Sequence, residues 1–218
     1  ACSIETILKL SRIDYNGFQM KEETLQEAVQ ILLKGGVIAH ATDTCYGFAC
    51  DIFNKNALQR LYKLKKMTAN KPVSILVADL KTAKKYGYFN KKAEKAAKKY
   101  WPGALTIVVR KKKILPDFLN PDTSTIGIRV PSDRISQTLA EKFGKPITTT
   151  SANISTLPSP YSASAIISQF KNRKIKPDFI LDTGRLSKKN LPSAIIDFSK
   201  KELRLIRQGS LKVDLKAF

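Results

Sequence analysis

Short apolar runs of strand length alternate along this chain with segments of helical periodicity, and this alternation most limits the folds available to it. Residues 37–41 and 73–77 are predominantly apolar runs of the kind found in buried strands. Between them, Ala57, Leu58 and Leu61 recur at the spacing of one helix face. Strands and helices that interleave irregularly predict an α/β domain built on a mixed, twisted sheet.

The same patterns place the individual elements. Helices are expected at residues 22–34, 55–65, 81–87, 91–100, 133–143 and 161–171. Strands are expected at residues 37–41, 73–77, 105–109, 125–130, 146–150, 179–182, 193–198 and 202–207. A length of 218 residues, without repeats or a linker, predicts one domain over residues 1–218, with a motif-bearing core at about 22–210.

The location of the protein follows from what its sequence lacks. No apolar run approaches the ~20 residues that a membrane-spanning helix needs. The first residues, Ala1–Glu5, lack the basic and apolar segments of a signal peptide. We therefore expect a soluble, cytoplasmic protein that does not associate with a membrane.

Charge is the most unusual bulk property of the chain. It has 39 Lys and Arg residues against 18 Asp and Glu residues, a formal net charge of +21. Such an excess favours polyanions, namely nucleic acid, nucleotide phosphates or an anionic membrane surface. The basic residues are mostly scattered lysines, which are equally typical of a solvated surface, so charge alone assigns no function.

The cysteines and the histidine exclude several kinds of site. Cys2, Cys45 and Cys50 are an odd number without close pairs, so we expect neither a disulfide framework nor a zinc site. His40 is the only histidine and lies in an apolar run, which favours a structural residue of a buried strand over a catalytic base. We therefore expect no metal site, and chemistry that rests on positioned charges and phosphate contacts.

Small polar residues stand at the ends of several predicted strands: those at 42–44 and 148–153 follow apolar runs, and Ser193 begins a strand. In open α/β sheets the loops at strand ends form the ligand crevice. The same residue types dominate ordinary turns, so each segment alone is ambiguous. Glycine-rich phosphate loops are absent, and bound phosphates would then be held by separate side chains. The candidate cations are Lys65, Lys71, Arg129 and Arg207.

A series of short motifs occurs in one order along the chain. They are Thr42-Asp43-Thr44-x-Tyr46-Gly47, Lys65 with Pro72 seven residues on, Trp101-Pro102-Gly103-x-Leu105-Thr106, Arg129-Val130-Pro131, Ser151-Ala152-Asn153, Ser193-x-x-x-Asp197 and Arg207-x-Gly209. This ordered set closely resembles the YrdC-like family of threonylcarbamoyl-AMP synthases, over about residues 22–210. The resemblance implies the YrdC-like α/β fold, a twisted mixed sheet flanked by helices around a basic concave cavity, in its single-domain form.

The resemblance also implies a reaction. L-threonine, bicarbonate and ATP become threonylcarbamoyl-AMP and pyrophosphate, a nucleotidyl transfer with ATP as substrate and Mg²⁺ as the expected ion. Partner proteins of the TsaD type then transfer the threonylcarbamoyl group to a tRNA adenosine. By position, Thr44, Arg129, Thr149 and Ser193 would bind threonine, Lys71, Thr125, Ser151, Asn153, Ser159 and Arg207 would bind ATP, and Lys65 would act catalytically near the phosphates and the carboxylate.

The chain departs from the family pattern at three positions. The arginine of the family's Lys-x-Arg pair is Met67, a position that often holds histidine is Leu76, and the proline before Thr42 is Ala41. Losing a phosphate-facing arginine would remove a charge-assisted contact of about 1.5–3 kcal/mol. Two alternatives therefore stay open: a divergent YrdC-like paralogue that binds or hydrolyses a related adenylate, and a non-catalytic module that binds tRNA or double-stranded RNA.

Overall fold

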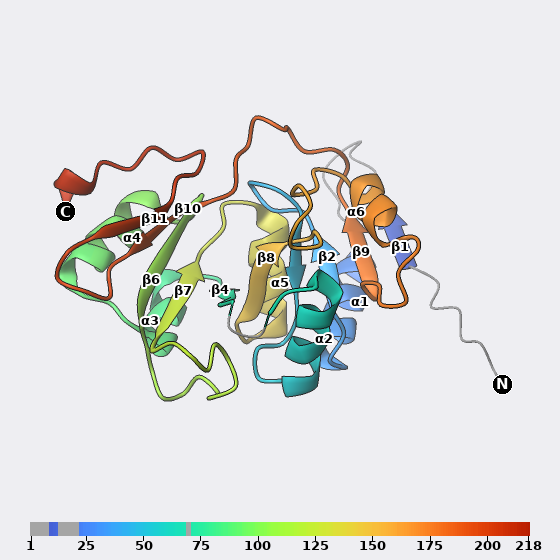
Figure 1. The fold of residues 1–218 in the computed structure, drawn as a ribbon, viewed down its shortest axis with the longest axis horizontal. Coiled ribbons are helices and arrows are strands. Elements are labelled where there is room, and N and C mark those ends of the chain that lie inside the picture. The colour runs from blue at the N-terminus through green and yellow to red at the C-terminus, as the bar shows by residue number, and fades with distance from the viewer. Residues whose placement is uncertain (1–8, 13–21, 69–70) are drawn as a thin grey trace.

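The computed structural model describes residues 9–12, 22–68 and 71–218, in which helices and strands interleave (Figure 1). The α-helices are α1 (Glu22–Leu33), α2 (Lys55–Lys65), α3 (Leu80–Tyr86), α4 (Lys91–Tyr100), α5 (Arg134–Phe143) and α6 (Ala163–Phe170), with a short 3₁₀ helix η1 (Leu215–Ala217). The strands are β1 (Lys9–Arg12), β2 (Ile38–His40), β3 (Gly47–Ala49), β4 (Ser74–Leu76), β5 (Gly87–Tyr88), β6 (Leu105–Lys111), β7 (Thr125–Arg129), β8 (Ile147–Ser151), β9 (Phe179–Asp182), β10 (Ala194–Asp197) and β11 (Arg204–Arg207). None of the helices in these ranges is both long and apolar enough to cross a membrane.

The eleven strands of the described residues form one mixed sheet. Their order is β1-β9-β2-β3-β8-β4-β7-β6-β10-β11, and β5 pairs with β6 outside this path. Parallel pairs such as β2 with β9 and β4 with β7 stand beside antiparallel pairs such as β3 with β8 and β6 with β7. The α/β fold with a mixed sheet, expected from the sequence, is confirmed.

The pairing of β8 with β4 joins the two halves of the sheet. Its antiparallel register aligns Ser74 with Thr149, Ile75 with Thr148 and Leu76 with Ile147. β1, β9, β2 and β3 lie on one side of this pair, and β7, β6, β10 and β11 lie on the other (Figure 1). Segments from both halves, far apart in sequence, therefore meet in the middle of the molecule.

Helices cover both faces of the sheet, and the core is divided accordingly. On one face α1 and α5 pack against β2 and β9, where Leu32 and Phe179 are fully buried. On the other face α2 and α6 cover β3, and the rings of Phe48 and Phe170 meet edge to face at 5.7 Å. Because β2 is covered on both faces, all three of its residues are buried, His40 among them.

The helices occur where the sequence predicts them, whereas three short strands were missed. α2 has the predicted bounds, because the Asn54 side chain caps its first turn and Lys66, with φ of 49°, ends it. Asp133 caps α5, accepting a hydrogen bond from the Ser136 N–H at 2.8 Å. β1, β3 and β5 have only two to four residues each and no clear apolar alternation, so their sequences gave no strand signal.

Candidate functional site

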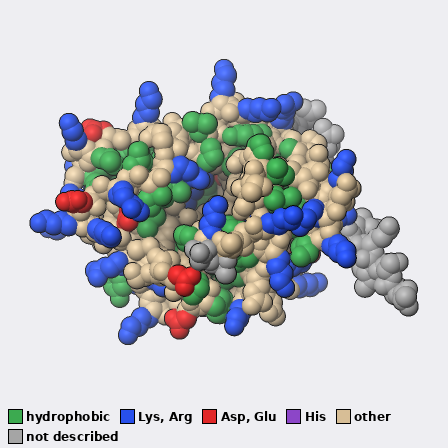
Figure 2. Space-filling model, in the orientation of Figure 1, with side chains coloured by type: hydrophobic (Ala, Val, Ile, Leu, Met, Phe, Trp, Pro, Cys, Tyr) green, Lys and Arg blue, Asp and Glu red, His purple; other side chains and the backbone are tan. Residues whose placement is uncertain are grey.

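A cavity of about 270 Å³ opens in the middle of the molecule, next to the β8–β4 pair. The face in Figure 2 is hollowed near its centre, with Lys and Arg side chains beside the hollow. The polar lining is Thr42, Thr44, Cys45, Lys65, Lys71, Ser74, Thr106, Arg129, Thr149, Thr150, Ser151, Asn153, Ser155, Ser159, Ser193 and Arg207. Of the described residues, no Asp or Glu lines it. The cavity is small beside the ~300–1,000 Å³ of typical ligand pockets, so a nucleotide would extend through its opening.

Ten of the eleven site residues assigned from the sequence line this cavity. The exception is Thr125, which begins β7 and whose hydroxyl lies 2.8 Å from that of Thr123. Arg129, at the other end of the same strand, does line the cavity. The structure thus brings the assigned residues together from both halves of the sheet, with Thr125 outside the group.

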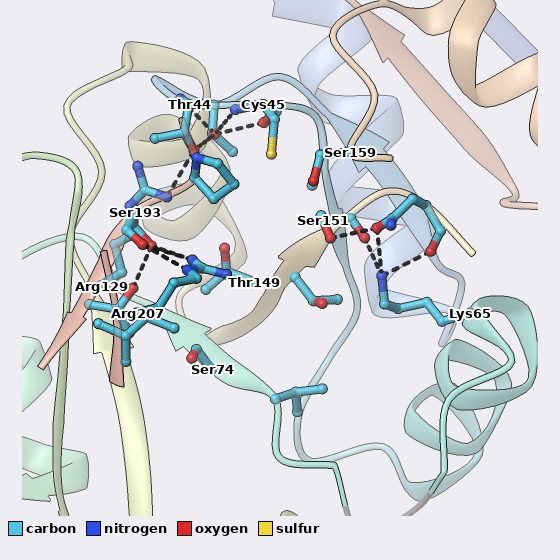
Figure 3. Close-up of a pocket in the computed structure, with 18 of the residues that line it drawn as sticks. Thr44, Cys45, Lys65, Ser74, Arg129, Thr149, Ser151, Ser159, Ser193 and Arg207 are labelled. Carbon is cyan, nitrogen blue, oxygen red and sulfur yellow. Dashed lines mark hydrogen bonds between the residues drawn. The ribbon is translucent and has the colours of Figure 1, made fainter. Parts of the chain in front are cut away.

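The turn after β2 holds Thr44 in a fixed position. Thr42 Oγ1 accepts hydrogen bonds from the N–H groups of Thr44 at 3.1 Å and Cys45 at 3.3 Å. The hydroxyls of Thr42 and Thr44 lie 2.9 Å apart. The backbone N–H of Thr44 is thus hydrogen-bonded within the turn, and its hydroxyl points toward Arg129 (Figure 3).

Arg129 is a buried cation, only 4% exposed, that joins three segments of the site. Its Nη1 donates to Thr44 Oγ1 at 3.2 Å, its Nε donates to the Gly103 carbonyl at 3.3 Å, and its Nη2 pairs with the Asp43 carboxylate. A guanidinium group has five N–H donors, so one remains on Nη1 and one on Nη2. N–H donors of a charged group suit a carboxylate ligand.

A second polar cluster joins β6, β10 and β11. Ser193 Oγ lies 2.9 Å from Thr106 Oγ1. Arg207 folds back over Ser193, and its Nε and Nη2 donate to the Ser193 carbonyl at 3.0 and 2.8 Å (Figure 3). Gly209 packs against the same backbone, because a Cβ there would lie 2.2 Å from Ala194 N. The position of Ser193 therefore depends on the absence of a side chain at Gly209.

Lys65, at the end of α2, has an ammonium group that is already fully hydrogen-bonded. Nζ donates to the Ser151 carbonyl, to the Asn153 carbonyl at 3.0 Å and to Asn153 Oδ1 at 3.2 Å (Figure 3). Burial, and then the nearby charge of Lys71, lowers the pKa of Lys65 to about 8. Lys65 therefore positions the turn at residues 151–153, a role that the sequence did not reveal.

Met67, which stands where the family's Lys-x-Arg pair has its arginine, faces the cavity. Lys65 and Lys71 line the cavity beside it. Lys66 is exposed, has a left-handed backbone with φ of 49° and does not line it. Lys66 therefore does not take the place of the arginine.

His40 lies in the core rather than in the cavity. It is fully buried at the end of β2, and its Nδ1 lies 2.9 Å from the Ala41 carbonyl. Burial lowers the pKa of His40 and raises the pKa of Cys50 to about 12. Cys45 and Cys50 are free thiols, while Cys2 lies outside the described residues. The prediction that His40 is a buried strand residue is confirmed.

Sequence reasoning assigned no role to Thr42, Asp43 or Thr106, although each lies in one of the motifs. Asp43 pairs with Arg129, which is 86 residues away in sequence. Thr106 meets Ser193 across 87 residues. The sequence does not indicate contacts between residues so far apart. The only sign that these residues belong to the site was that they lie within the motifs.

Comparison with known proteins identifies the relatives of the chain. Residues 30–209 match a family model for Sua5, YciO and YrdC proteins, which is described as "Telomere recombination". The chain belongs to the Sua5/YciO/YrdC family. A relative from Methanocaldococcus jannaschii, provisionally named as a threonylcarbamoyl-AMP synthase, is 34% identical over 200 residues, which make up 90% of this chain and 92% of that protein.

Two solved structures of Sua5/YciO/YrdC proteins are similar to this one. Pyrococcus abyssi Sua5 complexed with L-threonine matches with a TM-score of 0.83 and 29% identity, over 93% of this chain and 57% of that chain. Escherichia coli YciO matches with a TM-score of 0.81 and 27% identity, over 93% of this chain and 96% of that one. The fold is YrdC-like, and the chain spans little more than half of the P. abyssi protein.

Proposed function

We propose that this protein is an L-threonylcarbamoyladenylate synthase, a nucleotidyltransferase. It makes threonylcarbamoyl-AMP and pyrophosphate from L-threonine, bicarbonate and ATP, for tRNA threonylcarbamoyladenosine modification. The observation that carries the proposal is that one cavity contains two kinds of cation. Arg129 is paired with Asp43 and is surrounded by hydroxyl groups. Lys71 and Arg207 have no carboxylate partner among the described residues. Relatives named threonylcarbamoyl-AMP synthase, and the threonine complex of P. abyssi Sua5, support it.

The amino-acid subsite consists of Thr44, Arg129, Thr149 and Ser193. The two unused N–H groups of Arg129 hold the threonine carboxylate, and the hydroxyls of Thr44 and Ser193 complete its hydrogen bonds. In the described lining there is no carboxylate that could serve as counter-ion to an α-ammonium group. The cavity therefore suits an amino acid whose nitrogen carries a carboxylate, as it does after reaction with bicarbonate.

The nucleotide subsite consists of Lys71, Ser151, Asn153, Ser159 and Arg207, with Thr125 added by family resemblance alone. Lys71 and Arg207 offset the charge of the triphosphate, and the three polar side chains from the 151–159 segment supply directional hydrogen bonds. The carboxylate-free lining does not fit a resident Mg²⁺ ion, which prefers oxygen ligands that include carboxylates. Mg²⁺ would instead arrive on the phosphate oxygens, as part of the substrate.

The reaction brings two anions together. A carbamate oxygen of N-carboxythreonine attacks the α-phosphorus, and a new P–O bond forms as the bond to pyrophosphate breaks. Pyrophosphate leaves with the electron pair, and because the nucleophile is already an anion, no general base is needed. The chain contributes alignment of the two substrates and fixed positive charge around the phosphates, which lower the barrier between them.

The pKa of Lys65 predicts a pH dependence of nucleotide binding. Lys65 is charged below its pKa of about 8 and neutral above it, so its attraction for phosphate is lost as the pH rises. We expect ATP affinity to fall about tenfold between pH 7 and pH 9, as measured by calorimetry. A Lys65→Met variant should bind ATP weakly with a flat profile, and a flat profile in the wild-type protein would show that the charge of Lys65 does not act on the phosphates.

Restoring the missing arginine tests whether the cavity works as the family's does. Met67→Arg places a cation next to Lys71 on the cavity wall, and a charge-assisted contact to phosphate is worth about 1.5–3 kcal/mol. We expect ATP affinity to rise about tenfold, with adenylate formation preserved. Lys66→Arg, at an exposed position, is the matched control and should change neither quantity. A strong loss of activity in Met67→Arg would indicate a repurposed pocket.

The direct test is incubation of the protein with ATP, threonine and bicarbonate, followed by mass spectrometry. We expect the threonylcarbamoyl-AMP mass and pyrophosphate to appear only when all three substrates are present. ATP consumption that does not depend on threonine would contradict the proposal and favour a paralogue acting on a related adenylate. Met67 is the observation that keeps this second candidate open.

We further propose that the adenylate passes in the cytoplasm to threonylcarbamoyl-transfer proteins of the TsaD type. The net charge of +21 also makes tRNA or double-stranded RNA a candidate partner. RNA binding of this kind would weaken steeply with salt and would not respond to threonine. Filter binding at two salt concentrations, with and without threonine, separates an RNA-binding role from the synthase.

A further inference from the structure

The Asp43 carboxylate lies directly behind the cavity without lining it. It pairs with Arg129 Nη2, and its other oxygen accepts a hydrogen bond from the Ser132 hydroxyl at 2.9 Å. The backbone N–H of Asp43 donates to the carboxylate of Asp133, the N-cap of α5, at 3.2 Å. The side chains of Arg129 and Asp43 are only 5% and 13% exposed. This carboxylate is therefore fixed from several sides in a poorly hydrated position.

Arg129 differs in this respect from the other cations of the cavity. Over residues 22–68 and 71–218, Lys65, Lys71 and Arg207 have no ion pair with Asp or Glu. The pair of Arg129 and Asp43 thus has a net charge near zero, whereas Lys71 and Arg207 present positive charge that no described carboxylate offsets. One cavity therefore holds a cation that is paired with a carboxylate, Arg129, and cations that are not, Lys71 and Arg207.

The net charge around each cation decides which anion is attracted to it most strongly. A phosphate group, with its higher charge, is attracted most by uncompensated cations and would be repelled by the nearby Asp43 carboxylate. A ligand carboxylate, with a single charge, is matched by the two remaining N–H groups of Arg129 and the adjacent Thr44 hydroxyl. Repulsion of a competitor by a fixed like charge is a general source of specificity.

We propose that Asp43 is a specificity-determining residue of this cavity. It keeps the Arg129 subsite for a carboxylate and directs phosphate groups to Lys71 and Arg207. The two substrates are therefore prevented from exchanging places. This inference rests on the proposed function, since it takes the amino acid at Arg129 and the nucleotide phosphates at the unpaired cations.

Competition between threonine and inorganic phosphate tests the inference. Threonine binding is measured by calorimetry with and without saturating phosphate, in the wild-type protein and in Asp43→Asn, which keeps the side-chain shape and removes its charge. We expect phosphate to lower the apparent threonine affinity less than about twofold in the wild-type protein and about tenfold in the variant. Equal competition in the two proteins, whether strong or absent, would overturn the inference.

Two further variants separate charge from packing. Asp178→Asn is the matched control, because Asp178 also pairs with an arginine, Arg60, at 2.5 Å, and neither residue lines the cavity. It should resist phosphate like the wild-type protein. Asp43→Glu keeps the negative charge and should also resist phosphate. Competition in Asp43→Glu as strong as in Asp43→Asn would attribute the effect to packing and refute the specificity role.

Ser132→Ala keeps the test decisive even when Asp43→Asn does not fold. Ser132 is exposed, so its replacement leaves the core intact while releasing one anchor of the Asp43 carboxylate. We expect phosphate competition of about threefold in this variant, and none would count against the inference. A wild-type protein that binds no threonine at all would refute the proposed function, and the role of Asp43 with it. Normal threonine binding with unchanged competition refutes the role of Asp43 alone.

Discussion

Arg129→Ala is expected to weaken threonine binding at least about 100-fold while changing ATP affinity less than about threefold. The substitution removes two charge-assisted hydrogen bonds to the threonine carboxylate, each worth about 1.5–3 kcal/mol. The nucleotide cations Lys71 and Arg207 keep their positions, because neither is hydrogen-bonded to Arg129 in the structure. Calorimetric titrations with threonine and with ATP measure the two affinities.

This substitution also leaves the Asp43 carboxylate without its partner. Breaking a buried ion pair by removing one member typically costs about 3–5 kcal/mol of stability, so the variant is expected to melt at a lower temperature. The double variant Arg129→Ala/Asp43→Asn removes the unpaired charge and should recover stability without recovering threonine binding. An equal loss of threonine and ATP affinity in the single variant would show that the threonine role of Arg129 is misassigned.

Gly209→Ala is expected to damage the site although Gly209 does not line it. A Cβ at this position would lie 2.2 Å from Ala194 N and 2.4 Å from the Pro192 carbonyl, and both are backbone atoms that cannot rotate away. The start of β10 must therefore shift and carry Ser193 with it. We expect a loss of about 1–3 kcal/mol of stability and a fall in threonine affinity of about tenfold or more.

The adjacent residue offers a matched control for this prediction. Ser210 is exposed, and Ser210→Ala should change neither the melting temperature nor threonine binding. Thermal unfolding followed by circular dichroism, together with calorimetry, measures both effects. A Gly209→Ala variant with wild-type stability and wild-type threonine affinity would mean that β10 tolerates the displacement.

Local sequence signals were sufficient for the helices but not for the order of the strands. α2 was predicted residue for residue, because its apolar spacing and its cap are encoded within one segment. The position of β9 between β1 and β2 depends instead on pairing between segments far apart in the chain. β3 was not predicted, since three residues that follow a polar loop carry little strand propensity.

The candidate site was predicted as a set of residues rather than as a set of interactions. Family resemblance picked out Lys65 as a cation for phosphates, but its pKa and its hydrogen bonds to the 151–153 turn arise from burial, which sequence does not encode locally. Thr125 was assigned by position, and the structure puts it at the far end of β7 from Arg129. Family resemblance predicts which residues belong to the site. Their hydrogen-bond partners and their pKa values depend on how the chain packs.

Because the β8–β4 ladder is short, ligand binding is expected to restrict motion between the two halves of the sheet. Only three residue pairs connect the two halves of the sheet at this ladder. The proposed ligands would touch Ser151 on one side of it and Ser193 on the other. A ligand that contacts both residues would link the two halves of the sheet. The halves would then move less relative to each other in the ligand-bound protein than in the ligand-free protein.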